Sequence, residues 1–174
     1  MKDFTAPLSD TLGIAAICKR GDPRDAIVSH FHAIILAVAA LKRLNINKQL
    51  YTPLNLASMI PAMGQGAIMV QYRLNDHKIL DLVHLIHDKD TEICINSEKT
   101  IISKLAIGCR IPIGIYAKIK KKNKIWIKTI VGSINGSTII RSEGKSQVSE
   151  AQKLCDKQVQ KLIDQGAKKI LQSS

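Results

Sequence analysis

The segment Leu105-Ala106-Ile107-Gly108-Cys109-Arg110-Ile111-Pro112-Ile113-Gly114 decides the fold, because it joins a predicted helix to the first strand of a predicted sheet. The apolar spacing before it predicts a helix over 91–105, and Gly108 stands where helices commonly end. Three runs that predict strands then follow, at 111–119, 124–131 and 137–141. Cys109 thus lies on a short glycine-flanked loop before a strand, where a thiol can serve as a covalent attachment point.

Turn and helix signals around these strands predict a self-contained α+β unit over residues 74–174. Asn135-Gly136 is a strong hairpin signal between the last two strands. Apolar stripes at helical spacing flank the strands on both sides. The last of these helices begins at a candidate capping box formed by Ser149 and Gln152. We therefore predict a three-stranded antiparallel sheet with helices.

Residues 1–73 carry shorter and more scattered patterns. Strands are predicted over 12–18, 33–37 and 67–72, and one short helix over 39–44. Prolines and glycines mark the connection that leads to the third strand. We place a domain boundary just after Arg73. The half that precedes it would expose apolar surface unless a partner covers it.

The net charge of +12 raises the question of nucleic-acid binding. The lysines are spread along the chain, and only three Tyr, two Phe and one Trp could stack on bases, so we expect no nucleic-acid partner. The lysine run over 118–128 is interpreted as a solvated turn and an outer sheet face. The charge also suits a small substrate that carries carboxylates.

The cysteine pattern and the apolar runs bound the cellular setting. The four cysteines are far apart and form no CxxC pair: Cys18, Cys94, Cys109 and Cys155. We therefore expect no metal site, no disulfide framework and a cytoplasmic location. The longest apolar run, 33–41, is about half of what a bilayer span needs, so no membrane partner is expected.

Five further segments have distinctive residue combinations: Met1-Lys2-Asp3, Asp22-Pro23-Arg24-Asp25-Ala26, Phe31–Leu44, Pro61-Ala62-Met63-Gly64-Gln65-Gly66-Ala67 and the glycine and arginine pattern of Gly132–Gly144. Together with the Cys109 loop, they resemble, in the same order, motifs of the hydroxymethylbilane synthase family, also called porphobilinogen deaminases. The resemblance implies an enzyme of tetrapyrrole biosynthesis. It would join four porphobilinogen molecules head to tail, with loss of ammonia, onto a cysteine-linked dipyrromethane.

The resemblance also implies catalytic roles. Asp3 would be the catalytic carboxylate, which contacts pyrrole N–H groups and handles protons. Lys2, its neighbour, would pair with substrate or cofactor carboxylates. Without the family, a Lys-Asp pair at a chain start is normally a solvated terminus.

Four residues would bind the cofactor. Cys109 would hold dipyrromethane covalently, and Arg43 would pair with its acetate and propionate carboxylates. Gln65 and Gly66 would line the site through close backbone approach, although an ordinary tight turn explains them equally well. Arg43, taken alone, is a cation at a helix end.

The chain departs from the family pattern in two places. It starts at the methionine of the His-Ser-Met-Lys-Asp motif, and at Ser29-His30 it lacks a block that bears arginine-rich segments. Residues 1–73 would thus be an incomplete remnant of two periplasmic-binding-protein-like doubly wound domains, and residues 74–174 the cofactor-bearing domain. We expect a monomer unless a separate N-terminal chain completes it. The alternatives are an inactive remnant, a fragment that needs that separate piece, and a basic binding protein.

Overall fold

The computed structural model describes residues 2–5, 16–19, 33–57, 59–105 and 112–172. The chain forms two compact units, one made of Met1–Pro7 with Ala62–Ser174 and the other of Leu8–Pro61. Within the described ranges, no helix combines the length and apolar character that a membrane span requires.

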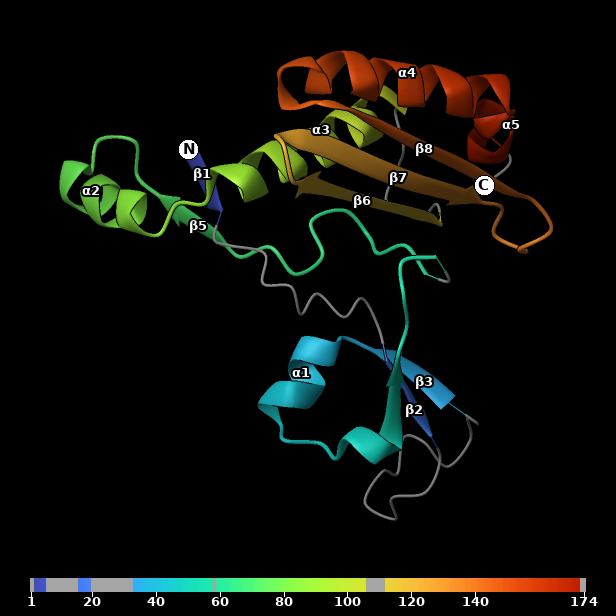
Figure 1. The fold of residues 1–174 in the computed structure, drawn as a ribbon, viewed down its shortest axis with the longest axis horizontal. Coiled ribbons are helices and arrows are strands. Elements are labelled where there is room, and N and C mark those ends of the chain that lie inside the picture. The colour runs from blue at the N-terminus through green and yellow to red at the C-terminus, as the bar shows by residue number, and fades with distance from the viewer. Residues whose placement is uncertain (1, 6–15, 20–32, 58, 106–111, 173–174) are drawn as a thin grey trace. The chain divides into compact units, whose positions relative to one another are not determined.

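The larger unit contains a three-stranded antiparallel sheet in the order β6-β7-β8 (Figure 1). Its strands are β6 (Ile113–Lys120), β7 (Lys124–Gly132) and β8 (Ile139–Gln147). Alternate residues of β7 are fully buried, as expected of a strand with one face on the core. The β6–β7 turn places Asn123 at φ 54°, and the β7–β8 turn places Gly136 at φ 70°. The predicted sheet and its turn signals are confirmed.

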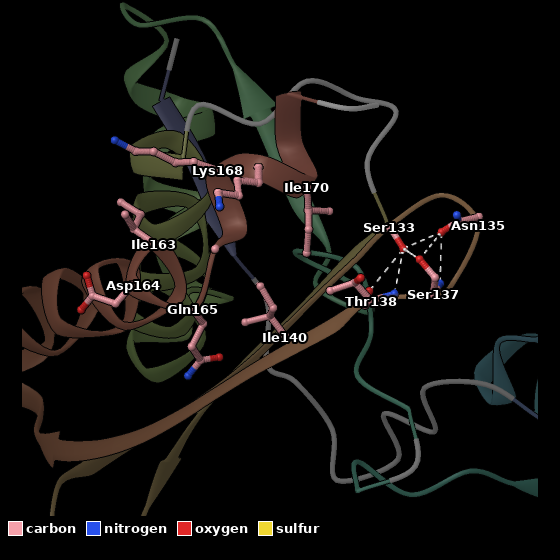
Figure 2. Close-up of a pocket in the computed structure, with 12 residues that line it drawn as sticks. Ser133, Asn135, Ser137, Thr138, Ile140, Ile163, Asp164, Gln165, Lys168 and Ile170 are labelled. Carbon is pink, nitrogen blue, oxygen red and sulfur yellow. Dashed lines mark hydrogen bonds between the residues drawn. The ribbon is translucent and has the colours of Figure 1, made fainter.

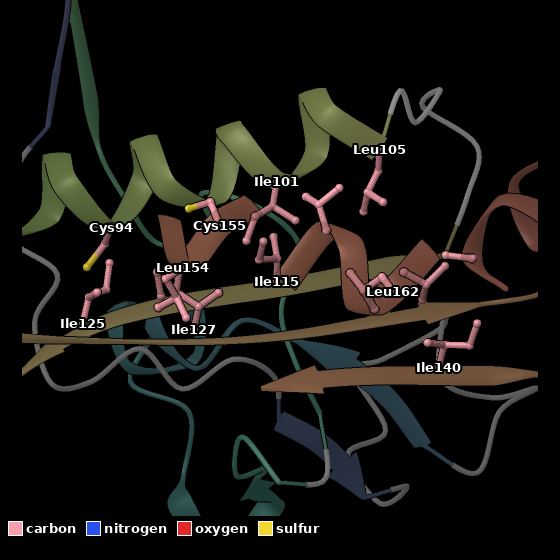
Figure 3. Packing of buried hydrophobic residues seen from close by; sticks show 14 of the residues in the cluster. Cys94, Ile101, Leu105, Ile115, Ile125, Ile127, Ile140, Leu154, Cys155 and Leu162 are labelled. Atoms are coloured by element: carbon pink, nitrogen blue, oxygen red, sulfur yellow. The ribbon is translucent and has the colours of Figure 1, made fainter. Parts of the chain in front are cut away.

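Three helices cover one face of this sheet: α3 (Lys89–Leu105), α4 (Ala151–Asp164) and α5 (Ala167–Gln172) (Figure 1). Their apolar side chains meet those of the sheet in one core, with Ile101 of α3 and Leu162 of α4 fully buried (Figure 3). The helix predicted over 91–105 is confirmed; it buries Cys94, Ile101 and Leu105, and Ile102 is partly buried. This core holds α3, and with it the start of the Cys109 connection, against the sheet.

The predicted capping box at the start of α4 is wrong. Ser149 lies in a 3₁₀ turn, Val148–Glu150, and the N-cap residue is Glu150, which makes no side-chain cap hydrogen bond. The N–H of Val148 donates to the carbonyl of Asn123 at 3.0 Å. This bond extends the β7–β8 pairing by one residue beyond Gln147. Ser149 lies one residue before the N-cap position and does not cap the helix.

The same unit also contains a two-stranded antiparallel sheet and a helix. β1 (Lys2–Thr5) pairs with β5 (Met69–Tyr72), and α2 (His77–Leu85) follows. Asp76 caps α2, because its side chain accepts the N–H of Ile79 at 3.2 Å. Val83 of α2 packs against Tyr72 of β5. This small cluster fixes α2 to the strand that follows the Gly-Gln-Gly motif.

The described part of the smaller unit contains a three-stranded antiparallel sheet and one short α-helix. β2 (Ala16–Lys19) lies between β3 (Ala33–Leu36) and β4 (Tyr51–Pro53), and α1 (Val38–Arg43) follows β3. A 3₁₀ turn, Lys48–Leu50, precedes β4. Val38, Leu41 and Tyr51 form a buried cluster in the described part of this unit. The predicted strand and helix over 33–44 are confirmed; α1 ends at Arg43 with Leu44 as its C-cap, and Asn45 just beyond has φ 54°.

Candidate functional site

Two of the sequence motifs lie on neighbouring strands of the larger unit. In the β1–β5 pair, Lys2 is opposite Tyr72 and Asp3 is opposite Gln71. β5 begins two residues after Ala67, the last residue of the Gly-Gln-Gly motif. α3 also contacts β1. The backbone of the predicted catalytic pair is therefore next to the strand that leaves the predicted cofactor-lining loop.

The Gly-Gln-Gly motif forms two consecutive tight turns. The N–H of Gln65 donates to the carbonyl of Ala62 at 3.2 Å, and the N–H of Ala67 donates to that of Gly64 at 3.0 Å. Gly64 has φ +69° and Gly66 has φ +85°, so each turn has a glycine at its third residue in the left-handed region. Gln65 is exposed between them. The tight turn is confirmed, and its cofactor contact stays a prediction.

A buried carboxylate fixes this loop, and the sequence patterns did not reveal it. Glu98 of α3 is only 3% exposed. Its Oε2 accepts the N–H of Gly64 at 2.8 Å, and its Oε1 accepts the N–H of Ala117 in β6 at 2.8 Å. Burial raises the pKa of Glu98 to about 7, while the two N–H groups act to lower it. One sequence feature indicates its burial: Glu98 is at helical spacing from Cys94 and Ile101, which are buried on the same side of α3.

The two thiols whose surroundings the structure describes are both protected by burial. Cys94 and Cys155 are buried and unpaired in the core. Burial raises the pKa of Cys94 to about 12 and also raises the pKa of Cys155, whose thiol donates to the carbonyl of Ser97 at 3.6 Å. Because the thiolate is the nucleophilic form, these two cysteines are poor attachment points.

Cys109 lies in the connection between α3 and β6. That connection starts after Leu105, the end of α3, and reaches Ile113, the start of β6. Residues 106–111, Cys109 included, are outside the described part of the chain. Where the connection reaches the sheet, the carbonyl of Pro112 accepts the N–H of Gly132 at 2.8 Å. Both ends of the cysteine-bearing connection are thereby attached to the core of the larger unit.

Arg43 is in the smaller unit. It is the last residue of α1 and is exposed, whereas Leu41 two residues earlier is buried against Val38 and Tyr51. A cation at this position interacts favourably with the helix C-terminus. Its predicted contact with cofactor carboxylates stays a prediction, as do the side-chain roles of Lys2 and Asp3.

A separate hollow of about 730 Å³ lies between the β7–β8 hairpin and the turn from α4 to α5 (Figure 2). Its polar hairpin atoms bond to one another: Asn135 Oδ1 accepts the hydroxyl of Ser133 at 2.8 Å and the N–H of Ser137 at 3.1 Å. Arg43, Gln65 and Gly66, the predicted site residues whose surroundings the structure describes, do not line it. Among the described residues, no group of His, Cys, Asp and Glu is placed to hold a metal ion.

Comparison with known proteins agrees with the motif order. A family model described as "Porphobilinogen deaminase, C-terminal domain" matches residues 92–164, and one described as "Porphobilinogen deaminase, dipyromethane cofactor binding domain" matches residues 28–81. The porphobilinogen deaminase of Blochmanniella pennsylvanica (strain BPEN) is 30% identical over 206 residues, which cover 88% of this chain and 68% of that protein. The chain belongs to the porphobilinogen deaminase family. The enzyme of Blochmanniella floridana is 32% identical, with 88% of this chain and 66% of that protein covered.

This family consists of transferases of tetrapyrrole biosynthesis that act on porphobilinogen and use a dipyrromethane cofactor. The chain spans about two thirds of the length of these two relatives. Each alignment extends over 206 residues, more than the 174 of the chain, so the relatives have residues to which nothing in this chain corresponds.

Proposed function

We propose that this chain acts as a hydroxymethylbilane synthase, which condenses four porphobilinogen molecules head to tail onto a dipyrromethane linked to Cys109. The observation that supports this most is that two family motifs lie together in the larger unit, beside the helix that leads to the third. The Lys2-Asp3 strand pairs with the strand after the Gly-Gln-Gly loop, and Glu98 attaches that loop to the helix that leads to Cys109.

Asp3 would act on the substrate at two points of each condensation. Its carboxylate would accept hydrogen bonds from pyrrole N–H groups and stabilise the cation that forms when ammonia leaves. It would then take the proton released when the new carbon–carbon bond forms. Lys2 would pair with an acetate or propionate carboxylate and so orient the ring.

The thiol chemistry of the chain is consistent with a single attachment point for the cofactor in this unit. Burial favours the neutral thiols of Cys94 and Cys155, whereas Cys109 lies between α3 and β6 in the sequence, outside the described residues. Gln65 and Gly66, exposed at the apex of their double turn, would line the cofactor, and Arg43 would pair with its carboxylates. When bound, the dipyrromethane supplies the terminal pyrrole carbon to which the first substrate is joined.

Turnover of porphobilinogen by the purified chain, after incubation with substrate to assemble the cofactor, tests this proposal. We expect hydroxymethylbilane and ammonia to form, and we expect Asp3→Asn to lower kcat by about 100-fold or more. Asp81→Asn, the same change at an exposed position of α2, is the matched control and should keep the wild-type rate. No turnover by the wild-type chain, or full activity of Asp3→Asn, contradicts the proposal.

We also propose a domain history for the chain. Residues 1–73 would derive from the two doubly wound, periplasmic-binding-protein-like domains of the family, and residues 74–174 would be its cofactor-bearing domain. The match of residues 92–164 to the C-terminal domain model supports a separate second domain, whereas the model described as the dipyromethane cofactor binding domain matches residues 28–81 and the strand pairs described in the smaller unit are all antiparallel. The unpaired core thiols Cys94 and Cys155 support a reducing, cytoplasmic setting.

A second candidate function is that of a fragment that works only with a separate chain. The shortfall of about one third against the two relatives favours it. A polypeptide with the missing arginine-rich segments, added to the purified chain, would then restore turnover and shift the mass from monomer to a one-to-one complex. If the chain alone turns over porphobilinogen as a monomer, this second candidate is wrong.

A further inference from the structure

Glu98 joins three segments that the sequence keeps apart. It belongs to α3, which leads into the Cys109 connection. One carboxylate oxygen accepts from Ala117 in β6, the strand that leaves that connection, and the other accepts from Gly64 in the Gly-Gln-Gly loop. Ala117 is on the edge strand of the sheet, because among the described strands β6 pairs with β7 alone. Glu98 thus links the edge strand β6 to the Gly-Gln-Gly loop through its two carboxylate oxygens.

The chemistry of this contact requires an ionised carboxylate. Both partners are backbone N–H donors, and a carboxylate offers acceptors on both oxygens. A protonated carboxyl group, or the amide of glutamine, would turn one of these atoms toward an N–H as a donor. One of the two backbone N–H groups would then lose its partner, which is costly in a buried place.

The neighbours of Glu98 include few groups that could balance its charge. The loop over 62–67 contains no titratable side chain and contributes its backbone N–H. In β6, Tyr116 and Lys118 flank Ala117 and alternate to the opposite face of the sheet. On α3, the Cys94 thiol interacts with Glu98 one turn away. β1, which contacts α3, carries Lys2 and Asp3.

We propose that Glu98 is a positioning residue of the active site, whose ionised carboxylate holds the Gln65-Gly66 turn against the α3–β6 pair that flanks Cys109. The catalytic meaning of this contact rests on the proposed function, whereas the contact itself does not. If the Glu98 carboxylate no longer accepts these two hydrogen bonds, the turn loses its attachment to α3 and β6, while the core beneath them stays intact.

Amide hydrogen exchange of the full chain at pH 8 tests the contact without any turnover. In Glu98→Gln, we expect the amide of Gly64 or of Ala117 to lose about tenfold or more of its protection, the loss expected for one charge-assisted hydrogen bond. Glu92→Gln is the matched control, because Glu92 is on the same helix and its side chain is 44% exposed. Wild-type protection of both amides in Glu98→Gln overturns the proposal.

A second measurement needs no variant, so it applies even if Glu98→Gln does not fold. Protection of Gly64 in the wild-type chain, corrected for intrinsic exchange rates, should fall as the pH is lowered through about 7, where Glu98 takes up a proton. A protection that does not change with pH between 5 and 8.5 contradicts the ionised contact.

Kinetics then separate the contact from its catalytic meaning. With turnover established, Glu98→Gln should raise KM for porphobilinogen or lower kcat, and it should remove an ionisation near pH 7 from the profile of kcat/KM. If Glu98→Gln exchanges these amides faster but keeps the wild-type kcat, KM and pH profile, Glu98 does not position the active site. If Glu98→Gln exchanges these amides faster but the wild-type chain shows no turnover, the result supports the contact and counts against the proposed function.

Discussion

The raised pKa of Glu98 predicts an unusual dependence of stability on pH. The folded chain holds this carboxyl at a pKa of about 7, against 4.5 for the unperturbed group. Only the ionised form makes both hydrogen bonds, but the desolvation of its charge outweighs them, so the folded state binds the proton more tightly than the unfolded state does. The stabilisation from that proton is fully present below pH 4.5 and is lost as the pH rises through 7. A shift of this size corresponds to about 3 kcal/mol in the free energy of unfolding of the larger unit.

The comparison of wild type with Glu98→Gln isolates this contribution, because glutamine does not titrate. The difference in unfolding free energy between the two proteins should change by about 3 kcal/mol from pH 4.5 to pH 8, with the wild type losing stability. Glu92→Gln should instead follow the wild type. The upper limit of pH 8 keeps the Cys94 thiol, whose pKa is raised to about 12, outside the measured range.

Urea denaturation followed by tryptophan fluorescence measures these free energies. The chain has a single tryptophan, Trp126 in β7, whose indole N–H donates to Glu143 at 2.7 Å. Its emission therefore reports unfolding of the larger unit. A difference between wild type and Glu98→Gln that stays constant from pH 4.5 to pH 8, or that changes in favour of the wild type as the pH rises, refutes the reasoning.

Three further substitutions test the packing. Gly144→Ala should destabilise the larger unit by about 1–3 kcal/mol in urea denaturation, since the added Cβ would lie 2.3 Å from Nε2 of Gln158, and a loss under about 0.5 kcal/mol contradicts this. Leu162→Ala, at a fully buried position of α4, should cost about 2–5 kcal/mol by the same assay, and a near-neutral result would mean that α4 is not packed as described. Gly66→Ala should cost about 1–2 kcal/mol because of its φ of +85°, measured as faster amide exchange of residues 62–67 with β7 unchanged, and unaltered exchange contradicts the left-handed turn.

The sheet and its covering helices could be predicted because their sequence periods are clear. In β7, buried isoleucines alternate with outward lysines and Trp126, and the apolar stripe of α3 has helical spacing. The end of β8 was missed because Glu143, Lys145 and Gln147 face outward and Gly144 faces α4, so its second half has no apolar residue facing the core. α5 was missed because six residues give too short a pattern.

The candidate site could be predicted only in part, for reasons that are also physical. Local motifs predict the tight turns at Gln65 and Gly66, which depend on nearby residues, whereas the cofactor contact of these residues stays a prediction. Glu98 was missed because a glutamate normally indicates a solvated position, and its partners are backbone N–H groups 34 and 19 residues away in the sequence. A local sequence pattern cannot reveal contacts over such separations, and the position of Glu98 on the buried face of α3 is the one sequence feature that indicates its burial.

The central claim is that Cys109 carries the cofactor of a porphobilinogen-condensing enzyme, and the intact mass of the purified chain with peptide mapping tests it most directly. We predict the added mass of one dipyrromethane, located on the peptide that contains Cys109 and absent from those containing Cys94 and Cys155. An unmodified Cys109 thiol after incubation with porphobilinogen, or an adduct on another cysteine, contradicts the account.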